Sequence, residues 1–211
     1  MSANRKIYVV GLTGGIASGK SEAARHLESQ GATCIDADAI SRRLTGENGE
    51  LLPTLREVFG DEVFDADGTL NRRALAAIVF DDPVKRRTLD AVTHPAIQKA
   101  MMDEMDAAEA NGDPIVFLNV PLLFETGMDA LCDETWLISL DPERQKDRLM
   151  ARDGLTAEEA QARIDAQMPL EEKEARATVV IDNRKSLDKM FSELTGLFNS
   201  LYKRVSKMEN E

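Results

Sequence analysis

A glycine-rich loop near the start of the chain places the tightest limit on how this sequence can fold. Residues 14–21 read GGIASGKS and fit the pattern G-x-x-x-x-G-K-[ST]. The glycines let the backbone approach a ligand closely, so that successive N–H groups can surround phosphate oxygens. A helix that begins at the end of the loop adds the positive end of its dipole. The apolar run 7–10 and the helical pattern 20–30 therefore predict a strand, a phosphate-binding loop and a helix in succession.

Two side chains at the end of the loop complete the predicted phosphate site. Lys20 can reach the outer phosphates as a point charge, and the Ser21 hydroxyl can ligate Mg²⁺. Glu22 comes next and is unusual, because an acid suits a helix N-terminus but not a neighbouring triphosphate. We expect its side chain to point away, with only its N–H near the phosphates. The predicted nucleotide contacts in this stretch are Gly14, Gly15, Ala17, Ser18, Gly19, Lys20, Ser21 and Glu22.

Further short apolar runs predict the rest of a parallel sheet. They alternate with helical segments, which is typical of an α/β domain. The expected strands are 7–10, 33–35, 115–120, 135–140 and 178–181. A strongly periodic segment, 187–205, predicts a final helix that packs on the sheet, and residues 207–211 are expected to fray.

The segment 39–112 contains no convincing core strand. Its pattern is helical, and we expect Pro53, Pro83, Pro95 and the turn-like residues 65–68 to interrupt it. The segment is too long for one crossover, so it predicts a helical insertion at the ligand-binding edge of the sheet.

A second helical unit is predicted closer to the C-terminus. Thr156 and Glu159 have the spacing of a capping box, which predicts a helix over 156–167.

The composition argues against several kinds of partner. The chain has 211 residues and a net charge of −12, which fits one domain and disfavours a general nucleic-acid or anionic-membrane surface. No apolar run is long enough to span a membrane, and the N-terminal segment does not resemble a signal peptide. The two cysteines form no metal-binding or disulfide pattern. We therefore expect a cytoplasmic protein that holds an anionic ligand through a local group of basic residues and backbone N–H groups.

The phosphate loop alone does not distinguish a kinase from a GTPase switch or an ATPase motor. A GTPase would need a D-x-x-G motif and a base-binding N-K-x-D motif. Residues 65–68 read D-x-D-G, but no N-K-x-D occurs in the sequence, so a switch has little support. A kinase also needs a group that orients or deprotonates the acceptor hydroxyl.

Asp36 and Asp38 are the candidates for that group. They follow the second expected strand, and the carboxyl ends of strands in an open α/β sheet face the ligand crevice. Either could serve as general base or organise Mg²⁺, and the alternative is that one of them caps the following helix. Because side chains alternate along a strand, we expect only one of the two to face the acceptor.

A pair of arginines offers a second candidate group. Arg148 and Arg152 are four residues apart and share a helix face, which could clamp a phosphate. The alternative is a solvated face on which they pair with Glu143 or Asp147. The spacing does not decide between the two.

The ordered motifs along the chain resemble those of the dephospho-coenzyme A kinase family. The resemblance covers nearly the whole chain, and its later motifs are far more specific than the phosphate loop. The matching stretches are GLTGGIASGKS at 11–21, DADAI at 36–40, residues 67–83, HPAI at 94–97, VPLLFE at 120–125, residues 148–173 and VIDN at 180–183.

The resemblance implies a reaction and a fold. The family transfers the γ-phosphate of ATP to the 3′-hydroxyl of the ribose of dephospho-CoA, the last step of coenzyme A biosynthesis, so ATP, Mg²⁺ and dephospho-CoA are the implied ligands. The implied fold is a three-layer α/β/α P-loop NTPase domain with a five-stranded parallel sheet. Core residues would be 5–38, 113–141 and 175–207, with a CoA-substrate insertion at 39–112 and a lid at 142–174.

The resemblance also implies roles for individual residues. Asp38 matches the catalytic base or acceptor orienter, Arg152 matches a lid arginine, and Asn183 matches a position near the adenine. Lys20 and Arg152 would act with Asp38 in the transfer, and Arg148 would contact ATP. The implied acceptor-binding residues are Asp36, Asp38, Arg42, Arg72, His94, Leu122 and Glu125.

The chain departs from the family pattern at a few places. Ala17 stands where a glycine is frequent, Thr178 stands where an aspartate is usual, and no glycine follows Asn183. We expect a monomer or a weak homo-oligomer. A nucleoside-monophosphate-type kinase and a nucleotide-binding regulator are the alternative functions.

Overall fold

The computed structural model describes residues 6–80 and 82–208. The chain divides into two compact units, one made of Met1–Ile35 with Met105–Glu211 and the other of Asp36–Glu104. We call them the sheet unit and the helical unit. Among the described helices, none has the length and apolar character needed to cross a membrane.

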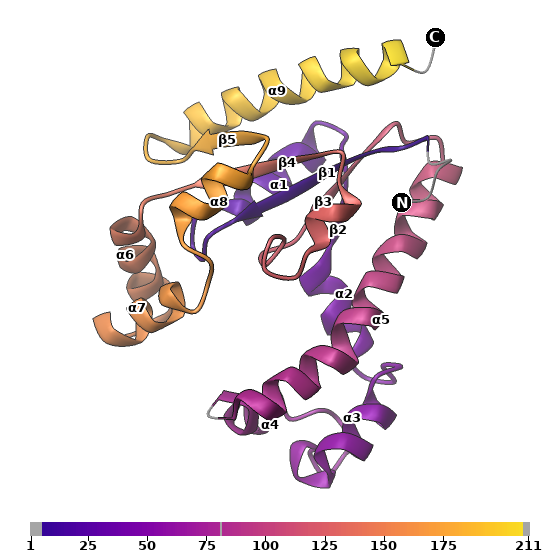
Figure 1. Ribbon diagram of the computed structural model, residues 1–211, viewed down its shortest axis with the longest axis vertical. Coiled ribbons are helices and arrows are strands. Elements are labelled where there is room, and N and C mark those ends of the chain that lie inside the picture. Colours follow the sequence, from indigo (N-terminus) through magenta and orange to yellow (C-terminus); the bar gives the residue numbers. More distant parts are fainter. Residues whose placement is uncertain (1–5, 81, 209–211) are drawn as a thin grey trace. The chain divides into compact units, whose positions relative to one another are not determined.

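A single five-stranded parallel sheet organises the fold, in the order β2-β3-β1-β4-β5 (Figure 1). The strands are β1 (Tyr8–Gly14), β2 (Thr33–Asp36), β3 (Ile115–Asn119), β4 (Glu134–Ser139) and β5 (Val179–Asp182). Val10 of the central strand β1 lies opposite Phe117 of β3 and Glu134 of β4. The loop that follows β1 therefore begins in the middle of the sheet's carboxyl edge, where ligands of open α/β sheets bind.

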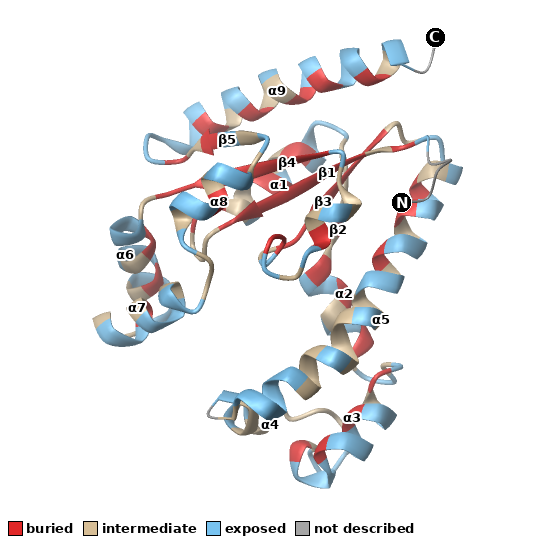
Figure 2. Cartoon of the chain, in the orientation of Figure 1, coloured by how far each residue is buried: buried red, intermediate tan, exposed pale blue. Residues whose placement is uncertain are grey.

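Two helices cover one face of this sheet. They are α1 (Lys20–Ser29) and α9 (Leu187–Met208). Phe117 and Trp136 from the strands pack in one buried core with Leu27 of α1 and Phe198 of α9. Figure 2 shows the buried stripe of α9 turned toward the strands and its other side exposed, as the 3.6-residue period of its apolar residues predicts.

The opposite face is covered by the segment after β3 and by α8 (Leu170–Arg176), whose Glu174 carboxylate accepts from the Ser139 hydroxyl of β4 at 2.7 Å. The side chain of Leu123 packs so closely on β1 that a Cβ at Gly11 would lie 2.6 Å from it. Further helices after β3 are η2 (Met128–Leu131), α6 (Pro142–Asp153) and α7 (Ala157–Asp165). With helices on both faces, the predicted three-layer α/β architecture is confirmed.

The helical unit consists mainly of helices, as the sequence predicts, but one of the predicted helix breaks is wrong. Its elements are α2 (Ala37–Leu44), α3 (Leu52–Phe59), η1 (Asp61–Val63), α4 (Arg72–Phe80) and most of α5 (Pro83–Ala110). The turn at 65–68 is present, with the Gly68 N–H donating to the Asp65 carbonyl oxygen at 2.9 Å. The predicted break at Pro95 is wrong, because α5 continues through it. Pro83 begins α5 and Pro53 lies in the first turn of α3, where the missing N–H costs no helical bond.

Local patterns in the sequence identified the main elements correctly. All five predicted strands are present, although β1 extends to Gly14. The capping box is confirmed, since the Thr156 hydroxyl accepts from the Glu159 N–H at 3.2 Å and the Glu159 carboxylate accepts from the Thr156 N–H at 2.8 Å. The resulting helix α7 ends at Asp165, and α8 was not predicted as a separate element. The expected fraying concerned residues 207–211, of which the last three lie outside the described residues.

Candidate functional site

Buried contacts fix the shape of the phosphate loop. Gly19 has φ +99°, and a Cβ there would lie 2.3 Å from the Asn183 amide nitrogen. That amide donates to the Ser18 carbonyl oxygen at 2.6 Å, and Asn183 is almost completely buried after β5. Glycine is thus needed at 19 both for its backbone conformation and for the close approach of Asn183.

A second close approach explains why residue 15 of the loop is a glycine. The amide of Gln145, a buried residue of α6, lies against Gly15, where a Cβ would be 2.7 Å from the Gln145 side-chain oxygen. Gln145 also donates to the Leu140 carbonyl oxygen at 2.5 Å. The conformation of the loop is therefore supported by the side-chain amides of Gln145 and Asn183, which lie outside the G-x-x-x-x-G-K-[ST] motif.

The lysine of the loop is held by a residue that sequence reasoning missed. Lys20 Nζ donates to the side-chain oxygen of Asn119, a buried residue at the end of β3. The signal was present, because Asn119 is a polar residue inside the apolar run 115–120. Its contact with Lys20 spans 99 residues of sequence and depends on β3 lying next to β1.

Of the two candidate arginines on α6, Arg148 and Arg152, only the first bonds the loop among the described residues. Arg148 donates to the Ala17 carbonyl oxygen at 3.2 Å, and Ala17 has φ +58°, a conformation that favours glycine. Arg152 makes two hydrogen bonds with Asp153, at 2.7 and 2.9 Å, and these raise the pKa of Arg152 above its usual value. Arg152 therefore stays charged, but its guanidinium bonds within α6 and not with the loop.

The acid after the loop has its own partner. The Glu22 carboxylate lies 3.1 Å from Arg25 one turn further along α1. Its charge also contributes, as the smallest of the causes, to the raised pKa of Arg152.

The two candidate aspartates differ from what strand alternation predicts. β2 ends at Asp36, whose carboxylate accepts from the Ala39 N–H at 2.8 Å and caps α2. Asp38 is already a residue of α2 and is exposed. The alternation argument was wrong because the cap at Asp36 starts the helix at once, so the two side chains follow helical and not strand geometry.

Three basic or aromatic candidates lie within the helical unit. Arg72, at the start of α4, donates to the Thr45 hydroxyl at 2.8 Å and so ties α4 to the end of α2. Arg42 is exposed in the last turn of α2. His94 lies 3.6 Å from the Asp90 carboxylate one turn earlier in α5.

The last two candidates follow β3 in the sheet unit. Leu122 is an exposed apolar side chain whose carbonyl oxygen accepts from the Thr126 N–H at 3.0 Å. Glu125 is bonded to the segment before α8, since its carboxylate accepts from the Met168 N–H at 3.1 Å and lies 2.8 Å from Lys173 Nζ.

Thr178, one of the departures from the family pattern, has a structural role. Its hydroxyl accepts from the Thr135 N–H at 3.0 Å, and its own N–H donates to the Thr135 hydroxyl at 3.1 Å. This reciprocal pair joins the start of β4 to the start of β5.

The geometry fits a nucleotide whose Mg²⁺ is bound mainly through phosphate oxygens. Ser21 is exposed in the first turn of α1, directly after the loop. No cluster of three or more His, Cys, Asp or Glu side chains suited to a metal occurs in the part of the chain that the structure describes. Mg²⁺ typically takes only one or two protein ligands beside substrate phosphates, and the single hydroxyl of Ser21 is compatible with that coordination.

A parallel α/β sheet with a phosphate loop after its central strand, and a lysine and an arginine at that loop, defines a P-loop nucleotide-binding domain. The family model described as dephospho-CoA kinase matches residues 8–189. The chain therefore belongs to the dephospho-CoA kinase family.

Individual relatives agree with this assignment. The chain is 48% identical to the dephospho-CoA kinase of Symbiobacterium thermophilum, over 86% of this chain and 76% of the relative. It is 46% identical to that of Anaeromyxobacter dehalogenans, over 83% of both. Among solved structures, TT1252 from Thermus thermophilus superposes with a TM-score of 0.80 at 41% identity, covering 93% of this chain and 99% of that one. The dephospho-CoA kinase of Campylobacter jejuni gives 0.65 at 25% identity, over 93% and 98%.

Proposed function

We propose that this protein transfers the γ-phosphoryl group of ATP to the 3′-hydroxyl of the ribose of dephospho-CoA, releasing coenzyme A and ADP. The observation that carries the proposal is the family match over residues 8–189, which includes the whole helical unit as well as the phosphate loop. A general nucleotide-binding protein would be expected to match through the loop and the sheet alone.

The residues on the ATP side have distinct proposed tasks. Lys20, held by Asn119, offsets negative charge on the outer phosphates, and Arg148 adds a second charge beside Ala17. The backbone N–H groups of the loop hold the remaining phosphate oxygens. The Ser21 hydroxyl would hold Mg²⁺, whose charge offsets that of the phosphates when it is bound.

Asn183 has a proposed task on the same side. Its side-chain oxygen is buried and accepts no hydrogen bond from the residues that the structure describes, which suits an acceptor for the exocyclic amine of adenine.

The tasks proposed for the residues on the acceptor side follow from the family resemblance of their positions. Asp38 is exposed and can orient or deprotonate the 3′-hydroxyl, whereas the carboxylate of Asp36 caps α2. Arg152 would approach the transferred phosphoryl when the lid closes and excludes water. The proposed CoA contacts are Arg42, Arg72, His94, Leu122 and Glu125. The monomeric or weakly associated state and the cytoplasmic location stay predictions.

The function is tested by ADP release in a coupled assay. Dephospho-CoA should stimulate release strongly, and AMP or nucleosides should not. Stimulation by a nucleoside monophosphate would favour the nucleoside-monophosphate-type kinase. ATP binding without stimulation by any acceptor would favour a regulator.

A further inference from the structure

The segment that follows α7 is bonded to the sheet unit at several points. We call residues 167–176, which include α8, the anchor segment. At its start, the Gln167 side-chain oxygen accepts from the Ile16 N–H in the phosphate loop at 2.9 Å. Toward its end, the Glu174 carboxylate accepts from the Ser139 hydroxyl at 2.7 Å, and Arg176 lies 3.0 Å from Asp129. The anchor segment is thus tied to the loop, to β4 and to η2.

Glu125 forms the central attachment of the anchor segment. Its carboxylate accepts from the Met168 N–H and pairs with Lys173, whose side chain is 1% exposed. Removing the partner of a buried ammonium leaves an uncompensated charge, which is strongly destabilising. This pair therefore holds α8 in place firmly.

The preceding helix α7 shows the opposite pattern. Its side-chain bonds join Gln161 to Asp165 and Arg163 to Asp153, all within α7 and the end of α6. The change from local bonds to core bonds occurs between Ala166 and Gln167. A lid that closes over a nucleotide must bend where such a change occurs, because bonds to the core resist movement and local bonds move with the helix.

We propose that Gln167 is a positioning residue that orients the Ile16 peptide of the phosphate loop and forms the C-terminal hinge of the lid. The moving part then centres on α7 and ends at residue 166, before the end of the lid expected from the sequence, 142–174, because Gln145 and Arg148 of α6 are themselves bonded to the core. Because one side chain bonds the loop and ends the moving segment, a nucleotide that settles in the loop is coupled to the position of the lid. This inference rests on the proposed phosphoryl transfer.

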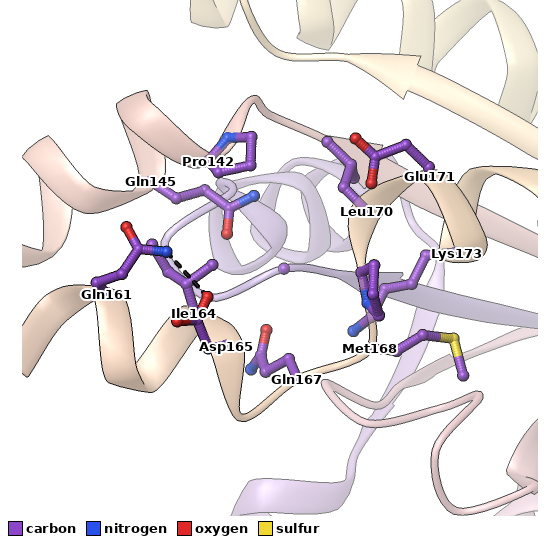
Figure 3. A pocket seen from close by; sticks show the side chains of 12 residues that line it. Pro142, Gln145, Gln161, Ile164, Asp165, Gln167, Met168, Leu170, Glu171 and Lys173 are labelled. Atoms are coloured by element: carbon purple, nitrogen blue, oxygen red, sulfur yellow. Dashed lines mark hydrogen bonds between the residues drawn. The ribbon is translucent and has the colours of Figure 1, made fainter.

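A cavity of about 270 Å³ lies between these two parts. It is bordered by Gly15 of the loop, by α6 and α7, and by the anchor segment. Figure 3 shows Gln145 and Gln167 entering it from opposite sides, with Lys173 reaching in from α8. Space on the lid side of a bonded segment is what a closing movement of α7 requires.

The test replaces Gln167 by Met, which keeps the length but removes the acceptor oxygen, and by Glu, which keeps an acceptor. The matched control is Gln161→Met, because Gln161 borders the same cavity, is half-buried and donates to Asp165 of the same helix at 2.9 Å. Three quantities are measured on the full chain: amide hydrogen exchange at Ile16 without nucleotide, steady-state kinetics, and ADP release in the absence of acceptor.

We expect Gln167→Met to speed Ile16 exchange and to lower kcat/KM for ATP up to about tenfold, mainly through KM, as the loss of one partly buried hydrogen bond predicts. ADP release without acceptor should rise relative to turnover, because a loose hinge admits water. Gln167→Glu should restore Ile16 protection, and Gln161→Met should match the wild type in all three.

Two results would overturn the inference. One is that Gln167→Met shows the same Ile16 exchange rate and the same kinetics as the control Gln161→Met. The other is an equal change in exchange and kinetics for Gln167→Met and Gln167→Glu, since the acceptor oxygen would then not matter. Exchange at Ile16 needs no turnover, so it separates this inference from the proposed function, which stands or falls on stimulation of the wild type by dephospho-CoA.

Discussion

The sheet unit and the helical unit hold their candidate residues in different ways. In the sheet unit, buried side chains fix the phosphate loop: Asn119 bonds Lys20, and Asn183 bonds Ser18. In the helical unit, Asp38 and Arg42 are exposed in α2. The proposed ATP side is therefore preorganised before any ligand binds, whereas we expect the proposed acceptor residues Asp38 and Arg42 to gain their geometry when the substrate binds.

The largest loss of activity is expected when the preorganised lysine, Lys20, is replaced. Lys20→Met should lower kcat/KM for ATP about a thousandfold, because a charge next to the transferred phosphoryl group is lost. Coupled ADP release measures it, with Lys189→Met on α9 as control. A loss of less than tenfold would mean that Lys20 does not serve the transfer and that the buried contact with Asn119 is only structural.

A smaller effect is expected at the acceptor side. Asp38→Asn should lower kcat about a hundredfold, since the hydroxyl is no longer deprotonated or oriented, and should leave ATP affinity unchanged. Isothermal titration with ATP and steady-state kinetics separate the two quantities. Asp36→Asn is the paired variant, because asparagine also caps helices well and α2 is retained. Full activity in Asp38→Asn with a loss in Asp36→Asn would transfer the role to Asp36.

The packing beneath the loop can be tested by a double-mutant cycle. Gly19→Ala should destabilise the protein by about 2 kcal/mol, because the new Cβ meets the Asn183 amide and the residue is left in a strained conformation. In an Asn183→Ala background the same change should cost only about 1 kcal/mol, since only the backbone strain remains. Urea unfolding measures both, and equal costs in the two backgrounds would show that the close approach carries no energy.

The smallest effect is expected at Ala17. Replacing it by glycine should raise the free energy of unfolding by about 0.5 kcal/mol, because a positive φ is strained for alanine and the gain exceeds the added chain entropy of glycine. The opposite substitution, Gly31→Ala, is the control, because Gly31 has φ +88° in open space at the end of α1. It should cost about 1 kcal/mol. A destabilised Ala17→Gly would indicate that the alanine side chain makes a favourable contact in the loop.

Much of the fold followed from local patterns. The run 7–10, the loop 14–21 and the capping box at Thr156 each depend on neighbours within a few residues, and each was predicted at nearly its observed position. The two errors also have local causes. Pro95 was expected to break a helix that accommodates it within α5, and the alternation expected of Asp36 and Asp38 ended because Asp36 caps α2.

The sequence by itself determined the phosphate loop, the order and approximate positions of the strands and the reaction class, because these depend on glycine positions, apolar periodicity and ordered motifs. Only the tertiary structure decided which side chains support the loop. Asn119, Gln167 and Asn183 reach it from 99, 151 and 165 residues away. Such contacts depend on the strand order β2-β3-β1-β4-β5 and on packing across it, which no local pattern encodes.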